Sequence, residues 1–345
     1  MVIVNSVDDP SGAPPPVRRR RGCLFYVRRG LVALILLILV LSVLGFVYEA
    51  AAEASDRQAY LPPGQLFDVD GHQMHIVCTG EGSPTVILEA AGGHFSTSWS
   101  WVQAEVEQTT RVCAYDRAGY GWSDPGPEPR DAQRIVSELH VLLGLAGVEP
   151  PYVMVGHSVG GLYVRVFDAQ YPGEVAGMVL VDATHPDTWE RQGESVATMQ
   201  MMAGASAALA RVGLLRLFFG GQDLGLPAGQ NAAVIADMSS GQYWDTQRAD
   251  LAAADATVDE GNAAGDLGDM PLAVLVALTY PEGPGRDTER ALQVELAALS
   301  TNSSYQEIDG AGHVTLVTDA QYARFVGEAI LNVIEAAQTG EPLAE

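Results

Sequence analysis

The sequence predicts an α/β protein: a mostly parallel, eight-stranded β-sheet with helices on both faces, preceded by one membrane-spanning helix. Short apolar strands alternate with helical stretches over most of the chain after residue 65, a pattern typical of βαβ units. Each strand is nearly continuously apolar, which indicates that both faces of the sheet are covered. The alternation stops between Asp182 and Pro271, where we expect a helical insertion before the penultimate strand.

Most of the expected strands are short runs of apolar residues bounded by turn signals. The strands are predicted at residues 67–69, 75–78, 85–88, 111–115, 152–155, 178–181, 271–278 and 304–308. Asp70-Gly71, between the first two, is a strong hairpin signal. The first two strands are therefore expected to be antiparallel.

Apolar residues at helical spacing predict helices over residues 131–146 and 319–337, and a third follows the sequence GHSVGG. The insertion is rich in Ala, Met, Leu and Gly and has no clear strand. We therefore expect an α/β core formed by residues 66–183 and 271–340, with a helical cap or lid over residues 184–270.

The N-terminal region carries a targeting or anchoring segment. Arginine clusters precede an unbroken apolar run at residues 31–47, LVALILLILVLSVLGFV. At 1.5 Å per residue the run is roughly 26 Å long, close to the hydrocarbon core of about 30 Å. We expect a basic cytoplasmic tail at 1–30, a signal-anchor helix at 31–49 and a linker at 50–65. Because positive residues stay cytoplasmic, the remainder is expected outside the cytoplasmic membrane.

A cleaved signal peptide is the alternative interpretation of this region. Ala50-Ala51-Ala52 and Ala52-Glu53-Ala54 both fit the small-x-small rule, and cleavage near residues 52–54 would give a secreted protein. The thirty residues before the apolar run are long for a signal peptide, which favours the anchor. A buried helix of a soluble protein would not be uniformly hydrophobic directly after four consecutive arginines.

The charge balance and the cysteines exclude some classes of function. The formal net charge is -24, and all 19 basic residues are arginine. Such a surface repels phosphates, so we expect no nucleic-acid partner. The three cysteines form no Cys-x-x-Cys pair and no cluster at zinc spacing, so no metal site is expected. No cofactor is implied.

The strongest chemical signal is the pentapeptide Gly156-His157-Ser158-Val159-Gly160. The strand YVMV runs directly into it, and a helix-compatible stretch follows. This is the strand–elbow–helix setting in which a serine nucleophile occupies a strained turn. The flanking glycines are required because a tight turn leaves no room for Cβ atoms. The helix N-terminus adds positive potential where an oxyanion develops.

These features resemble the α/β-hydrolase superfamily, onto whose pattern residues 66–337 can be laid. The segments that carry the resemblance are LEAAGGH, CAYDRAGYGWSD, VGHSVGGLYVRVF, MVLVDATHPD and DGAGHVT. Together they are specific, although any one of them would not be. The resemblance implies an α/β-hydrolase fold with Ser158 as nucleophile and the chain order Ser, acid, His.

A serine hydroxyl is barely ionised at neutral pH and needs an adjacent base. His313 follows the last predicted strand, where the superfamily places its catalytic histidine. His157, inside the elbow, is expected to point away from the nucleophile's partner. For the acid, the resemblance to members similar to haloalkane dehalogenases favours Asp182, at the end of the strand after the elbow. Glu282 and Asp287, near the end of the penultimate strand, are the alternatives.

An oxyanion hole needs two backbone N–H donors. The resemblance implies Val159, directly after the nucleophile, and Gly92 in the loop AAGGH, with Gly93 as the alternative to Gly92. This loop departs from the frequent His-Gly-x-x-x-Gly pattern.

The same resemblance predicts that two of the cysteines lie close together and that the insertion covers the site. In this fold the second strand lies beside the fourth, and these strands carry Cys78 and Cys113. Outside the cytoplasm the pair could form a disulfide, with two buried thiols as the alternative. The insertion would form a lid over Ser158. Its Met and Leu-Phe clusters would line an apolar acyl pocket or simply pack in the core.

We expect a serine hydrolase that cleaves a small or lipid-like carboxylic ester through Ser158, His313 and Asp182 and an acyl-enzyme. Haloalkane dehalogenases and typical epoxide hydrolases use Asp as nucleophile, whereas this elbow carries Ser158. The same triad would also serve an aminopeptidase, an acyltransferase or a cofactor-free perhydrolase. A non-catalytic receptor or scaffold is a further alternative, and the intact Ser158 and His313 argue against it.

Overall fold

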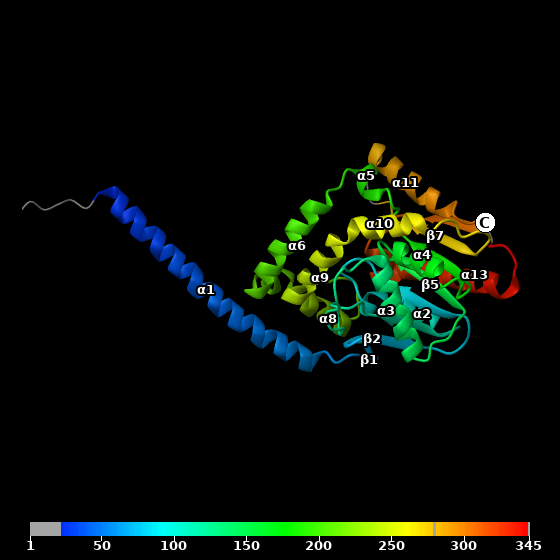
Figure 1. Cartoon of the computed structure of the whole chain (residues 1–345), viewed down its shortest axis with the longest axis horizontal. Helices are drawn as coiled ribbons and strands as arrows, with labels where there is room; N and C mark the ends of the chain where they lie inside the picture. Colours follow the sequence, from blue (N-terminus) through cyan, green and yellow to red (C-terminus); the bar gives the residue numbers. More distant parts are fainter. Residues whose placement is uncertain (1–21, 279–280, 344–345) are drawn as a thin grey trace, which may run out of the picture. The chain divides into compact units, whose positions relative to one another are not determined.

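The computed structural model of the protein describes residues 22–278 and 281–343. The chain divides into two compact units, Met1–Leu44 and Gly45–Glu345, and the second holds the sheet and its helices (Figure 1). Of the predicted basic tail, residues 1–21 lie outside the described residues.

Helix α1 (Cys23–Ala59) begins in the first unit and ends in the second. Among the described residues it is the helix long and apolar enough to cross a membrane, with a mean hydropathy of 3.1 over its most apolar stretch. The sequence predicts a linker over residues 50–65, and the structure corrects this, because the helix continues to Ala59. The Ala-rich sequence there favours helix, and Arg57 pairs with Glu53 one turn earlier, at 3.5 Å.

The sheet has eight strands in the order β1-β2-β4-β3-β5-β6-β7-β8. Strand β2 is antiparallel to β1 and β4, and all other neighbouring pairs are parallel. The predicted fold class is thereby confirmed. The strands are β1 (Gln65–Val69), β2 (His72–Thr79), β3 (Thr85–Glu89), β4 (Val112–Tyr115), β5 (Tyr152–His157), β6 (Val175–Val181), β7 (Leu272–Val276) and β8 (Ser303–Glu307).

Helices cover both faces of this sheet (Figure 1). Side chains alternate along the central strand β5, as strand geometry requires: Met154 belongs to one apolar cluster, and Val153 and Val155 belong to the other. The first cluster includes residues of α3 (Ala132–Leu145), α4 (Gly160–Gln170) and α11 (Pro284–Ala297). The second includes residues of α2 (Ser100–Val106) and α13 (Ala320–Thr339), with the 3-10 turn η1 (Ser96–Trp99) and the short α12 (Thr315–Thr318) beside them.

The insertion between β6 and β7 is helical. It contains α5 (Thr188–Gln192), α6 (Val196–Arg211), α7 (Leu214–Phe219), α8 (Ala228–Ser239), α9 (Gly241–Ala252) and α10 (Ala254–Ala263). A small apolar cluster joins it to the core, because Phe95 after β3 and Tyr120 after β4 pack with Val234 of α8 and Tyr243 of α9. These helices are here called the cap. They therefore lie over the carboxyl ends of β3 and β4, and ligands of open α/β sheets bind at the carboxyl ends of the strands.

Cys78 of β2 and Cys113 of β4 are joined by a disulfide. The two residues face each other in the register of the antiparallel pair β2–β4. The bond links an edge hairpin to the central part of the sheet and closes a sequence separation of 35 residues.

We predict that replacing both cysteines with serine lowers the free energy of unfolding by about 3–4 kcal/mol, because a closed loop of this size restricts the unfolded chain. Guanidinium unfolding of the full chain in detergent measures this, with Cys23→Ser as the control that leaves the disulfide in place. The prediction fails if reductant shifts the unfolding midpoint of the parent no more than that of the double variant.

Candidate active site

Ser158 lies in a tight turn between β5 and α4. Its φ of 55° is in the left-handed region, which costs a non-glycine residue free energy and is typical of functional turns. A Cβ on Gly156 would lie 2.6 Å from the carbonyl oxygen of Gly160, and one on Gly160 would lie 2.7 Å from that of Glu89. Both flanking positions therefore require glycine, and the turn presents Ser158 at the N-terminus of α4.

Asp182 follows β6, the neighbour of β5, and its φ of 43° is also left-handed. His157 and Val181 are the last paired residues of the two strands. The amide of Ser158 donates to the carbonyl of Val181 at 3.1 Å, and the amide of Thr184 donates to the carbonyl of Ser158 at 2.9 Å. The loops that carry Ser158 and Asp182 are thus hydrogen-bonded side by side at the carboxyl edge of the sheet.

His313 meets Asp182 in this structure. The imidazole Nδ1 lies 2.5 Å from Oδ2 of Asp182, and Oδ1 accepts a hydrogen bond from the amide of Ala277 at 3.2 Å. Because a carboxylate can only accept here, Nδ1 carries the proton, and Nε2 is the basic nitrogen of the neutral ring. Asp182 is buried, whereas the side chain of His313 is 41% exposed.

The two alternative acids lie elsewhere. The Asp287 carboxylate is 75% exposed and lies 3.9 Å from Arg290 on α11. Glu282 is exposed in the turn before α11. Asp182 is therefore the carboxylate that the structure places at His313.

The structure corrects the expected orientation of His157. Its Nε2 donates to the carbonyl oxygen of His313 at 2.9 Å, and the two ring centroids are 4.8 Å apart. As the last residue of β5, His157 alternates onto the same side of the sheet as Trp99, whose ring lies 6.2 Å away. Its side chain therefore holds the loop of His313 in place, a contact that strand alternation alone could not assign to a partner.

A third histidine, His94, lies close to His157 and His313. Nδ1 of His94 hydrogen-bonds the Ser98 hydroxyl at 2.9 Å, and the His94 ring centroid lies 6.3 Å from that of His157. Burial lowers the pKa of His94 to about 4 and holds the pKa of His157 well below its usual range. Both rings are therefore neutral at pH 7 and add no positive charge beside His313.

Gly92 and Val159 lie next to each other. A Cβ on Gly92 would be 3.6 Å from Cγ1 of Val159, and Gly92 is exposed. Gly93 is buried instead, and a Cβ there would meet side-chain atoms of Gln247 and Tyr243 on α9. Of the two glycines, Gly92 is thus the one beside the turn that carries Ser158.

Arg117, which the sequence analysis did not single out, sets the orientation of the loop that contains Gly92. Its guanidinium donates to the carbonyl oxygens of Ala90 and Ala91, each at 2.6 Å. The N–H of Gly92 belongs to the same planar trans peptide as the Ala91 carbonyl, so it points in the opposite direction, away from Arg117. Arg117 therefore determines where the Gly92 donor points.

The charge of Arg117 is compensated by Glu89, the last residue of β3. Arg117 Nη1 lies 2.5 Å from a carboxylate oxygen of Glu89, whose other oxygen accepts a hydrogen bond from the Tyr115 hydroxyl. Burial opposes the charge on Arg117, but Glu89 keeps the pKa of Arg117 above its usual range. The sequence signals for this arrangement were the segments LEAAGGH, which contains Glu89, and CAYDRAGYGWSD, which contains Tyr115 and Arg117.

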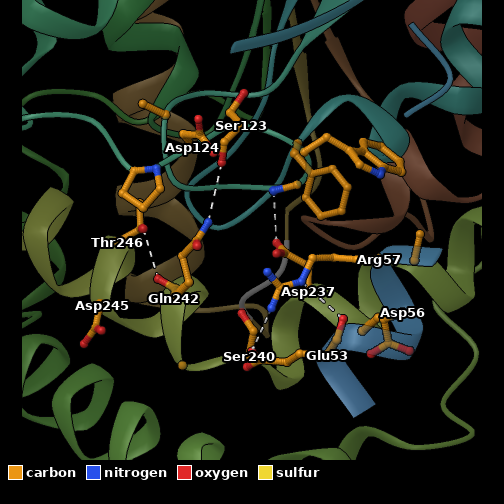
Figure 2. Close-up of a pocket in the computed structure, with 18 of the residues that line it drawn as sticks. Glu53, Asp56, Arg57, Ser123, Asp124, Asp237, Ser240, Gln242, Asp245 and Thr246 are labelled. Atoms are coloured by element: carbon orange, nitrogen blue, oxygen red, sulfur yellow. Dashed lines mark hydrogen bonds and ion pairs between the residues drawn. The ribbon is translucent and has the colours of Figure 1, made fainter. Parts of the chain in front are cut away.

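A cavity of about 730 Å³ lies between the last turns of α1, the loop after β4 and helices α8 and α9 (Figure 2). Of the described residues that line it, none is Ser158, Asp182 or His313. Asp237 points into it and accepts a hydrogen bond from the amide of Gly121 at 3.2 Å. Burial raises the pKa of Asp237 to about 8, so this carboxyl is mostly neutral at pH 7 and offers little attraction to a substrate amine.

One cluster of the described residues has side chains that could ligate a metal: His185, Asp187 and Glu295. The Glu295 carboxylate, however, already receives both of its hydrogen bonds from Arg191, at 2.8 Å each. Its charge is therefore compensated by the guanidinium.

Comparison with known proteins extends this picture. The chain matches a model of the "Alpha/beta hydrolase family" over residues 86–328. The uncharacterised protein YbdG of Bacillus subtilis is 25% identical over 46% of this chain and 49% of its own length. An uncharacterised vacuolar membrane protein of Saccharomyces cerevisiae is 31% identical over 34% of this chain and 21% of its own length. The chain thus spans about half or less of these two relatives.

Solved structures share the fold. The Cif epoxide hydrolase of Acinetobacter nosocomialis superposes with a TM-score of 0.64 at 15% identity, covering 84% of this chain and 96% of that one. A thermophilic esterase from Thermogutta terrifontis gives a TM-score of 0.57 at 19% identity, covering 80% and 99%. Sequence pattern, sheet order and family model agree, and the chain belongs to the alpha/beta hydrolase family.

Proposed function

We propose that this protein is a serine hydrolase that cleaves a carboxylic ester. The observation that carries the proposal is the hydrogen bond between Asp182 and His313 at the edge of the sheet where the strained turn presents Ser158. The structural neighbours include both an esterase and an epoxide hydrolase. The residue at the elbow favours the esterase reaction, because serine activated by histidine is a nucleophile for acyl transfer.

In this reaction Nε2 of His313 takes the proton of Ser158 as Oγ attacks the ester carbonyl. Asp182 holds the ring in the required tautomer and stabilises the imidazolium. The amides of Val159 and Gly92 donate to the oxyanion. Collapse of the tetrahedral intermediate breaks the bond to the alcohol, which leaves with the proton from His313. Water then attacks the acyl-enzyme with His313 again as base, and the acid product and Ser158 are released.

The surroundings of the site support a membrane-anchored enzyme with a covered substrate site. The apolar stretch of α1 would act as the anchor, and the cap over the carboxyl edge of the sheet would act as a lid. The aminopeptidase alternative has less support, because Glu194 is exposed and Glu260 accepts a hydrogen bond from the amide of Gln133 at the start of α3.

The first prediction from this proposal concerns the nucleophile. Ser158→Ala should reduce hydrolysis of p-nitrophenyl esters, from acetate to palmitate, at least a thousandfold, because it removes the attacking atom. The full chain in detergent is assayed, and Ser137→Ala, which removes a hydroxyl bonded within α3, should retain activity. Absence of both ester turnover and fluorophosphonate labelling in the folded parent would refute the serine hydrolase proposal.

The second prediction concerns the acid. Asp182→Asn should lower kcat by about three to four orders of magnitude, because an amide N–H facing His313 favours the wrong tautomer. Glu282→Gln and Asp287→Asn should leave kcat within about twofold, since these side chains are exposed. A large loss of kcat in either of those two variants, with Asp182→Asn active, would move the acid to that residue.

The third prediction concerns Arg117. Arg117→Lys keeps the charge but cannot bind Glu89 and both loop carbonyls at once. It should lower kcat about 10- to 100-fold with little change in KM, because the Gly92 donor loses its alignment. Arg130→Lys is the matched control, since Arg130 is also buried and paired with a buried glutamate, Glu138. An equal loss of kcat in both variants would mean that the effect is only on folding.

A further inference from the structure

The cap carries a short apolar face that no part of the described chain covers. On α7, Leu217 is 74% exposed and Phe218 is 69% exposed, and Leu214 is half exposed. Positions 214, 217 and 218 have the i, i+3, i+4 spacing that places side chains on one face of a helix. Exposed aromatic and aliphatic side chains grouped in this way mark an interaction surface.

The loop before α7 packs directly against the end of the apolar stretch of α1, within the second unit. A Cβ on Gly45 would lie 2.3 Å from the carbonyl oxygen of Val212, so the two backbones touch. A Cβ on Gly213 would lie 3.1 Å from the ring of Tyr48. Gly45 is still inside the apolar run, which ends at Val47.

Charges on the other side of α7 fasten it to α1. Arg216 binds both carboxylate oxygens of Glu49, with the shortest contact 2.6 Å, and binds Asp56 at 2.8 Å. Glu49 is only 2% exposed. A carboxylate two residues beyond an apolar span is costly in a low-dielectric environment unless it is paired. Arg216 supplies that partner and holds α7 at the height of Glu49.

These contacts determine the depth of the apolar face if α1 spans a bilayer. Gly45 and Val47 are about 3 Å apart along a helix axis at 1.5 Å per residue. A segment in contact with Gly45 therefore lies at the boundary between hydrocarbon and headgroups. The net charge of -24 gives anionic lipids no electrostatic attraction, so binding here would rest on apolar insertion.

We propose that the face formed by Leu214, Leu217 and Phe218 inserts into the headgroup region of the bilayer that α1 spans. The cap is then held against a lipid surface by two adjacent elements, α1 and α7. This inference rests on the proposed anchoring role of α1 and is independent of the proposed ester hydrolysis.

The test measures quenching of a fluorophore by lipid-attached nitroxides. Single cysteines replace Phe218, Ile38 and Val294 in the full chain carrying Cys23→Ser, and each is labelled with an environment-sensitive dye. The labelled chains are reconstituted in phosphatidylcholine vesicles containing nitroxide at carbon 5 or carbon 12 of the acyl chain. Val294 on α11 is the matched control, because it is also a large apolar side chain, 49% exposed. Ile38 lies near the centre of the apolar run and reports on the anchor.

We expect quenching at position 218 to be at least threefold stronger than at position 294, and stronger with nitroxide at carbon 5 than at carbon 12. Equal quenching at 218 and 294, with position 38 quenched, would overturn the proposal and leave the anchor intact. No quenching at position 38 would overturn the anchor and this inference together, without bearing on Ser158. A dye at 218 that is shielded from nitroxide only at high protein-to-lipid ratios would assign the face to a second copy of the chain instead.

Discussion

The buried ion pair between Glu89 and Arg117 is the interaction on which the candidate site depends. Two charges removed from water are tolerated only when they are closely paired and make further hydrogen bonds. Here the guanidinium is shared between Glu89 and the carbonyls of Ala90 and Ala91, and Tyr115 donates to Glu89 as well. The same bonds that make the buried charge tolerable also orient the peptide that ends in the Gly92 amide. Stability and geometry of the loop therefore come from one network.

Asp116, the neighbour of Arg117, extends this network to the rest of the loops. Its carboxylate accepts hydrogen bonds from the amides of Ser96 and Trp122 and lies 2.9 Å from Nδ1 of His75. The loops after β3 and β4 and the antiparallel strand β2 are thus tied at one buried point. A rigid loop system of this kind pre-organises hydrogen-bond donors, which is the main means by which a protein stabilises developing charge.

Buried arginine–glutamate pairs also occur outside the candidate site, including where the cap contacts α1. The chain is strongly acidic and contains no lysine, so a buried carboxylate that is paired with a permanently charged side chain is paired with arginine. Arg117 serves Glu89, Arg130 serves Glu138, and Arg216 serves Glu49. Guanidinium suits these positions because its planar fork satisfies several acceptors at once while remaining charged. The arrangement connects the core, the cap and the last turns of α1 through a small set of paired charges.

The sequence alone determined the fold class, the elbow and the apolar helix, because these are local patterns: continuously apolar strands, a glycine-flanked serine after a strand, and an uncharged run near the N-terminus. It did not determine which residues far apart in the chain meet. Strand order and the loops at the carboxyl edge of the sheet bring His313 to Asp182 rather than to Glu282 or Asp287. They also bring the side chain of His157 to the carbonyl oxygen of His313. The role of Arg117 depends on two carbonyls about 26 residues away in sequence, and the packing of α7 against α1 depends on the ion pairs of Arg216 with Glu49 and Asp56. Hydrogen bonds and ion pairs between distant segments leave no periodicity in the sequence, so only the tertiary structure could decide them.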